Sequence, residues 1–175
     1  LAVVLGADAY RKKLLGEEMV DVPLEALLEL AYADLRRNQE QFKEVAARIN
    51  PDRNVGDLLM DLQKDHPARE ELLPAFATSL AELRRFIERK KLLTLPLVPP
   101  PLVQDTPPLM RTHGLAWLEV PGPLDTSSPT ALFNVTVPAG YRTGEQLEQR
   151  MRWFSRPVIT GFALREGYPG RLTRA

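Results

Sequence analysis

The chain has 175 residues, of which 44% are hydrophobic and 26% are charged, a balance typical of a globular protein with one sizeable core. Lysine plus arginine and aspartate plus glutamate both number 23, so no net charge favours binding to nucleic acid or to an anionic membrane. Cysteine is absent, which excludes disulfide frameworks, cysteine zinc sites and thiol nucleophiles.

The sequence contains no segment that predicts a membrane span or a signal peptide. No run of about 18 apolar residues occurs, and Leu1 to Leu5 lacks a charged start and a long apolar stretch. We therefore expect a soluble chain, and the sequence specifies no compartment. The chain starts at Leu1 and ends at Ala175 without a helix stop signal, which indicates a fragment of a longer protein.

Five helices are predicted along the chain. The strongest covers residues 24–49, where apolar side chains recur every three or four residues and so share one helical face. Pro23 suits its first turn, and Asn50-Pro51 ends it because proline disfavours helical geometry in the residue before it. The other predicted helices cover residues about 8–18, 57–63, 80–91 and 143–164.

Local signals mark the ends of two of these helices. Ser79 with Glu82, and Thr143 with Gln146, have the spacing of a capping box. The basic residues between 84 and 91 fall where a helix dipole favours cations, so we interpret them as a solvated face and expect no nucleic-acid partner. Pro157 predicts a kink in the helix at 143–164, because proline removes one internal hydrogen bond.

Residues 95–137 are predicted to lack helices, unlike the segments on either side. Residues 95–108 contain six prolines, which exclude a helix, yet their other side chains are too apolar for a solvated linker. We expect a proline-rich strap packed on the domain surface. Residues about 115–137 contain two β-prone runs that predict a short antiparallel β-ribbon. The predicted fold class is therefore mainly α with this ribbon, as a single helical domain or fragment over residues 1–175.

The two histidines, His66 and His113, do not have the spacing of a metal site. His66 precedes Pro67 and His113 precedes Gly114, with no second histidine one helical turn away. We interpret both as structural residues.

Several segments follow one another in an order that resembles a known family. They are His66-Pro67, Asp105-Thr106-Pro107-Pro108, Pro121-Gly122-Pro123, Phe133-Asn134-Val135-Thr136 and the stretch from Phe154 to Gly170. This order resembles the bacterial domain-of-unknown-function family 885 over nearly the whole chain. The resemblance implies a larger helical, zinc-peptidase-like fold, of which this chain is an internal fragment, and it implies zinc as the cofactor.

The family signature is His-Glu-Ala-Tyr-Pro-Gly-His, and the matching stretch here reads Arg165-Glu166-Gly167-Tyr168-Pro169-Gly170-Arg171. The resemblance implies Glu166 as the general base and Tyr168 as a substrate contact. Both zinc-ligand histidines are replaced, by Arg165 and Arg171. Arginine stays protonated and offers only donors, so neither residue can ligate a cation. The family's third ligand, an acidic residue on a later helix, falls beyond Ala175.

These replacements predict a truncated or degenerate member of a zinc-dependent, peptidase-like hydrolase family, without metal-dependent activity and with no cofactor expected. Glu166 is then expected to pair with one of the two arginines. Two alternatives stay open. One is a non-catalytic helical binding or assembly module that self-associates through faces left uncovered by truncation, namely residues 147–162 and the proline-rich strap. The other is a hydrolase with a site unrelated to the motif.

Overall fold

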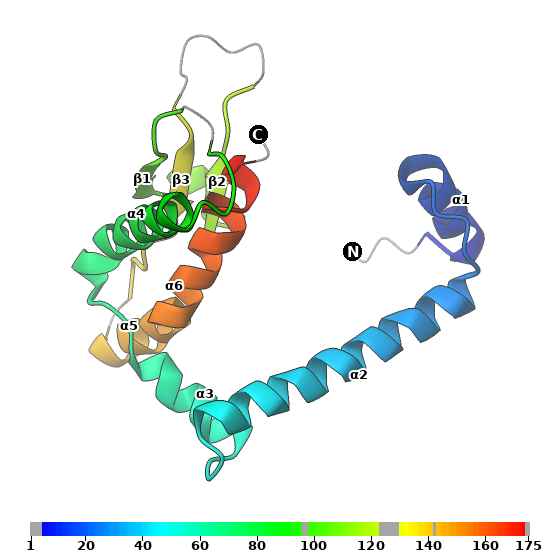
Figure 1. Cartoon of the computed structure of the whole chain (residues 1–175), viewed down its shortest axis with the longest axis horizontal. Coiled ribbons are helices and arrows are strands. Elements are labelled where there is room, and N and C mark those ends of the chain that lie inside the picture. The colour runs from blue at the N-terminus through cyan, green and yellow to red at the C-terminus, as the bar shows by residue number, and fades with distance from the viewer. Residues whose placement is uncertain (1–4, 96–97, 123–129, 142, 174–175) are drawn as a thin grey trace. The chain divides into compact units, whose positions relative to one another are not determined.

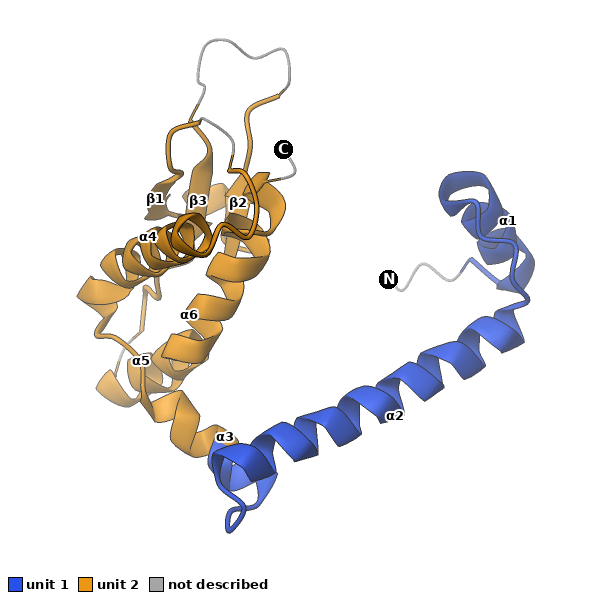
Figure 2. Ribbon diagram, in the orientation of Figure 1, with its two compact units in different colours: residues 1–58 blue, residues 59–175 orange. Residues whose placement is uncertain are grey.

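The structure is a computed structural model that describes residues 5–95, 98–122, 130–141 and 143–173. The chain divides into two compact units, residues 1–58 and residues 59–175 (Figure 2). Helix α3, Val55–Lys64, crosses the boundary between them.

The first unit consists of helices α1, Ala7–Glu18, and α2, Leu24–Ile49 (Figure 1). Pro23 stands directly before α2, and Asn50 ends the helix by donating its backbone N–H to the Ala46 carbonyl at 2.9 Å. The bounds of α2 are the residues that the apolar spacing and the flanking prolines indicate.

The apolar face of α2 is largely solvent-exposed. Ala46 is the one residue of this helix that is buried. Exposed apolar side chains recur along the helix at Leu28, Leu35, Phe42 and Ile49. The spacing of apolar residues therefore predicts the helix and its two faces, but it does not predict burial of the apolar face.

In the second unit the main helix is α4, Leu72–Lys90, which follows the short 3₁₀ turn η1, Arg69–Glu71. This helix begins well before the predicted start near residue 80, so the Ser79–Glu82 capping pattern lies inside it. The reason is tertiary packing, because Leu72, Phe76 and Leu80 recur every four residues and are all buried. Burial of this stripe extends the helix by two turns beyond the local signal.

Three short strands form a mixed sheet. Strands β2, Ala116–Glu119, and β3, Leu132–Val135, pair antiparallel, as the ribbon prediction requires. Strand β1, Leu102–Asp105, pairs parallel with the other side of β3, so the order is β1-β3-β2. The second part of the proline-rich segment is therefore a strand and not only a strap. The prolines of this segment lie before and after β1, so they leave its backbone donors available.

The predicted helix at 143–164 is divided into separate turns. Helix α5, Gly144–Met151, runs into the 3₁₀ turn η3, Arg152–Phe154, and a new helix, α6, Arg156–Phe162, starts after Ser155. Pro157 lies in the first turn of α6, where a missing N–H has no helical partner to lose. It therefore starts a second helix and does not kink a continuous one.

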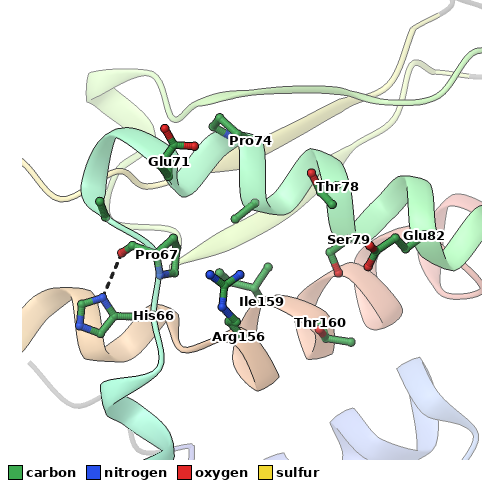
Figure 3. Close-up of a pocket in the computed structure, with 12 residues that line it drawn as sticks. His66, Pro67, Glu71, Pro74, Thr78, Ser79, Glu82, Arg156, Ile159 and Thr160 are labelled. Carbon is green, nitrogen blue, oxygen red and sulfur yellow. Dashed lines mark hydrogen bonds between the residues drawn. The ribbon is translucent and has the colours of Figure 1, made fainter.

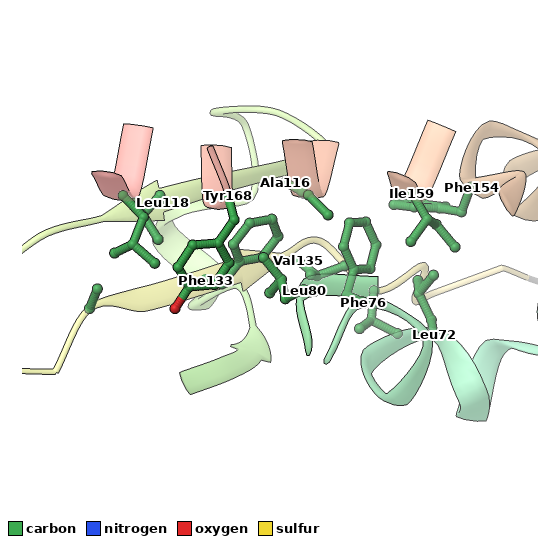
Figure 4. Close-up of a cluster of buried hydrophobic side chains, with 14 of the residues drawn as sticks. Leu72, Phe76, Leu80, Ala116, Leu118, Phe133, Val135, Phe154, Ile159 and Tyr168 are labelled. Atoms are coloured by element: carbon green, nitrogen blue, oxygen red, sulfur yellow. The ribbon is translucent and has the colours of Figure 1, made fainter. Parts of the chain in front are cut away.

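The core of the second unit joins α4, the sheet and the C-terminal helices (Figure 4). Phe76 is fully buried, and its ring centroid lies 5.6 Å from that of Phe133 and 6.5 Å from that of Phe154. Met151, Phe154 and Ile159 are all buried in this core. The face of residues 147–162 that we expected to be uncovered is thus packed against α4 and the sheet.

The mainly α fold class with a small sheet is confirmed. Among the described residues, no helix has both the length and the apolar composition that a membrane crossing requires. Residues 123–129, between the two β-prone runs of the ribbon, lie outside the described residues.

Replacing Phe76 by alanine should destabilise the second unit by about 3–5 kcal/mol, because it removes a fully buried ring and leaves a cavity. The matched control is Phe86→Ala on the same helix, where the side chain is 44% exposed. That change should cost less than about 1 kcal/mol. Urea unfolding followed by tryptophan fluorescence reports on this unit, because both tryptophans, Trp117 and Trp153, belong to it. Equal losses for the two variants would contradict the packing described.

Candidate functional site

The motif lies on a widened turn that continues α6. Residues Ala163–Gly167 form the π-helical turn η4, closed by a hydrogen bond of 3.0 Å from the Tyr168 backbone N–H to the Ala163 carbonyl. Tyr168 has extended backbone angles, as a residue before proline prefers, and the Tyr168–Pro169 peptide bond is cis. The chain then forms the 3₁₀ turn η5, Arg171–Thr173.

Both glycines of the motif lie very close to neighbouring atoms. A Cβ on Gly167 would lie 2.2 Å from a methyl carbon of the buried Leu80. A Cβ on Gly170 would lie 1.9 Å from the carbonyl oxygen of Arg165 and 2.4 Å from that of Leu164. Gly170 is required by this close approach to backbone carbonyls, whereas the neighbour of Gly167 is the end of a flexible side chain. That requirement is steric and involves no metal.

Glu166 is buried between two arginines. Its side chain is 9% exposed, and one carboxylate oxygen, Oε1, lies 3.1 Å from Nε of Arg165. The other oxygen, Oε2, lies 3.9 Å from an Nη atom of Arg171. The two guanidinium groups are largely in solvent, since the side chains of Arg165 and Arg171 are 78% and 59% exposed. The structure thus brings together the three charged residues of the motif, with both arginines on the same carboxylate.

The residues of this site do not fit the zinc ion that the resemblance implies. A zinc ligand needs a free lone pair on nitrogen, oxygen or sulfur, and a guanidinium group has none to offer. Two positive charges beside Glu166 would also repel a cation. In the part of the chain that the structure describes, no group of three or more histidine, cysteine, aspartate or glutamate side chains is arranged to hold a metal ion.

Tyr168 contacts helix α4. The residue is only 2% exposed, and its oxygen lies at the edge of the apolar cluster (Figure 4). Burial raises the pKa of the Tyr168 phenol, although the charge and the hydrogen bond of Arg84 act in the opposite direction. Arg84 also donates Nε to a Glu88 carboxylate oxygen at 2.9 Å, and this bond raises the pKa of Arg84. The phenol therefore stays protonated near neutral pH.

The two histidines have partners other than Glu166. In His66, Nδ1 lies 3.0 Å from the Pro67 carbonyl and Nε2 lies 3.1 Å from a carboxylate oxygen of Glu148. The hydrogen bond from His66 lowers the pKa of Glu148. His113 stacks on Trp117 with a centroid separation of 5.6 Å. Both histidines thus make contacts that hold neighbouring segments together.

His66 lies at one end of a polar pocket of about 530 Å³ (Figure 3). Ser79 and Glu82 of α4 line one side, and Arg156 and Thr160 of α6 line the other. Arg156 is paired with Asp65 at 3.1 Å, and it also donates its backbone N–H to the Asp65 carbonyl. No residue of the motif lines this pocket.

Sequence reasoning did not identify Arg84 and Glu88 as neighbours of Tyr168. The four-residue spacing of these two charges on α4 is a signal for their pair, but it carries no information about a tyrosine 84 residues from Arg84. That contact depends on how the C-terminal turn packs against α4.

The comparisons with known proteins identify a family. The family model described as "Bacterial protein of unknown function (DUF885)" matches residues 3–174. No curated protein and no solved structure matches the chain. The family match is the one that the order of segments indicates, so that prediction is confirmed. The chain belongs to the family of bacterial proteins of unknown function DUF885.

Proposed function

We propose that this chain is a non-catalytic, degenerate member of a zinc-hydrolase-like family, in which the segment from Arg165 to Arg171 acts as a structural turn. The observation that supports this proposal is that Arg165 and Arg171 both approach the buried carboxylate of Glu166. The residues at the family's zinc-ligand positions therefore supply positive charge where a metal site would need lone pairs.

The same arrangement gives Glu166 a structural role. A carboxylate that is 9% exposed has lost most of its hydration, and a nearby opposite charge offsets that loss. Arg165 comes from η4 and Arg171 from η5, so the two pairs connect the turns on either side of Pro169. We infer that the ion pairs stabilise the turn.

The wild-type chain, dialysed against zinc and then against buffer, should retain much less than one zinc per chain by elemental analysis. It should also show no chelator-sensitive hydrolysis of peptide or ester substrates. The double reversion Arg165→His and Arg171→His should raise the zinc affinity, because it supplies two imidazole ligands and removes two positive charges.

The matched control is the double change Arg165→Gln and Arg171→Gln, which removes the same charges without adding imidazoles. It should bind zinc more weakly than the histidine variant. Stoichiometric zinc in the wild-type chain together with chelator-sensitive turnover would refute the proposal. Hydrolysis that survives chelation and Glu166→Gln would instead point to a site unrelated to the motif.

Replacing Arg165 and Arg171 together by glutamine leaves the buried carboxylate of Glu166 without a partner. The free energy of unfolding of the second unit should therefore be about 1–2 kcal/mol lower in this double variant than in Glu166→Gln. Glu166→Gln leaves only solvated guanidinium groups unpaired, and these cost little.

Adding Glu166→Gln to the double arginine variant should recover part of the lost stability, as measured by urea unfolding. A triple variant that is less stable than the double variant would show that the carboxylate of Glu166 is not destabilising without its arginines. The proposed structural role of the ion pairs would then be wrong.

A second candidate function is self-association, which the exposed face of α2 favours. Leu28, Leu35 and Phe42 are all exposed and lie on the apolar face of one helix. Such a face can be buried by the same face of a second copy, and fully burying a side chain of this size contributes roughly 1.5–3 kcal/mol.

The wild-type chain should accordingly show a mass that rises with concentration in light scattering coupled to size-exclusion chromatography. Leu35→Glu with Phe42→Glu should weaken association at least about tenfold, because the change places charges on the apolar face. Arg36→Glu is the control, since this exposed side chain belongs to the charged face of α2, and it should change association little. A wild-type chain that remains monomeric at every concentration would rule this candidate out.

A further inference from the structure

A mostly apolar pocket lies beside Tyr168. It has a volume of about 660 Å³, within the range of roughly 300–1,000 Å³ that is usual for small-molecule sites. One wall is a stripe of α4 and the other is the segment from Pro100 to Val103. Leu80 and Tyr168 also line the pocket, and both are buried. All of these residues belong to the second unit.

Most of the pocket surface is apolar. Ala77 and Ala81 on α4 have small side chains, so the wall that they form leaves space. Pro100 and Pro101 have no backbone N–H, and Leu102 and Val103 add apolar side chains. The largest part of a bound molecule would therefore have to be apolar.

The polar groups of the pocket carry a net positive charge of one. Two arginines, Arg84 and Arg85, and one acid, Glu88, line it. Arg84 is paired with Glu88 at 2.9 Å. Arg85 uses Nε to bond the Ala81 carbonyl of its own helix at 3.2 Å, and among the described residues no acidic side chain pairs with it. The remaining nitrogens of Arg85 are thus available for a ligand.

We propose that this pocket binds a small monocarboxylate with an apolar body. The carboxylate pairs with the free edge of the Arg85 guanidinium, whose planar donors match the two oxygens. The apolar body lies against Ala77, Ala81 and the Pro100–Val103 segment. The net positive charge of the pocket would repel a cation. A dianion would carry one negative charge more than the single net positive charge of the pocket can neutralise. This inference does not depend on zinc or on Glu166, which does not line the pocket.

Octanoate is a suitable probe because it combines one carboxylate with an eight-carbon chain. Calorimetric titration of the full chain should show octanoate binding, with much weaker binding of octanol and of octylammonium at the same concentrations. In two-dimensional NMR spectra, octanoate should shift the backbone amide signals of Ala77, Ala81 and Val103.

Two variants test the two halves of the site. Arg85→Gln should weaken octanoate binding by about three- to tenfold, the effect expected for loss of a partly solvated charge-assisted pair. Ala81→Phe should weaken binding, because its ring occupies part of the pocket. Arg89→Gln is the matched control, since Arg89 lies on the same helix but does not line this pocket. It should bind octanoate like the wild type.

Three results would overturn the proposal. They are no octanoate binding at millimolar concentration, equal binding of octanoate, octanol and octylammonium, and equal weakening by Arg85→Gln and Arg89→Gln. If Ala81→Phe did not fold, as judged by circular dichroism, the pair of exposed arginine variants would still decide the outcome. Failure of this proposal would leave the zinc prediction untouched, because that prediction is measured on other residues.

Discussion

The close approach of Gly167 to Leu80 is the contact on which the architecture around the motif depends. Because glycine has no Cβ, the C-terminal turn can lie directly against the buried face of α4 and near the Phe133 ring of β3. This approach places Glu166 and Tyr168, the neighbours of Gly167, at the edge of the core with different partners. Glu166 faces two arginines of its own turn, whereas Tyr168 contacts Arg84 on α4.

The steric requirements of this turn do not involve a metal ion. Gly170 is required by sterics, because its neighbours are backbone carbonyls, so it is needed whether or not a metal is bound. The positions of Arg165 and Arg171 are largely exposed, so long charged side chains fit there without entering the core. The Glu-Gly-Tyr-Pro-Gly turn is thus held by packing and by ion pairs among its own residues and their neighbours.

Local signals in the sequence predicted some elements and missed others for identifiable reasons. Helix α2 follows from its apolar spacing and its two flanking prolines, which act within a few residues. The start of α4 at Leu72 and the pairing of β1 with β3 depend on burial against distant segments, and the nearby capping and proline signals gave no indication of them. The charged neighbours of Glu166 could be named because they are close in sequence, whereas Arg84 beside Tyr168 could not.

The central claim is that arginines, and not a metal ion, neutralise Glu166. The most direct test is a crystal structure of the wild-type chain grown with excess zinc, with anomalous scattering used to locate the metal. We expect no zinc at Glu166, with Arg165 and Arg171 both beside its carboxylate. A zinc ion bound to that carboxylate, with the two arginine side chains turned away, would contradict it.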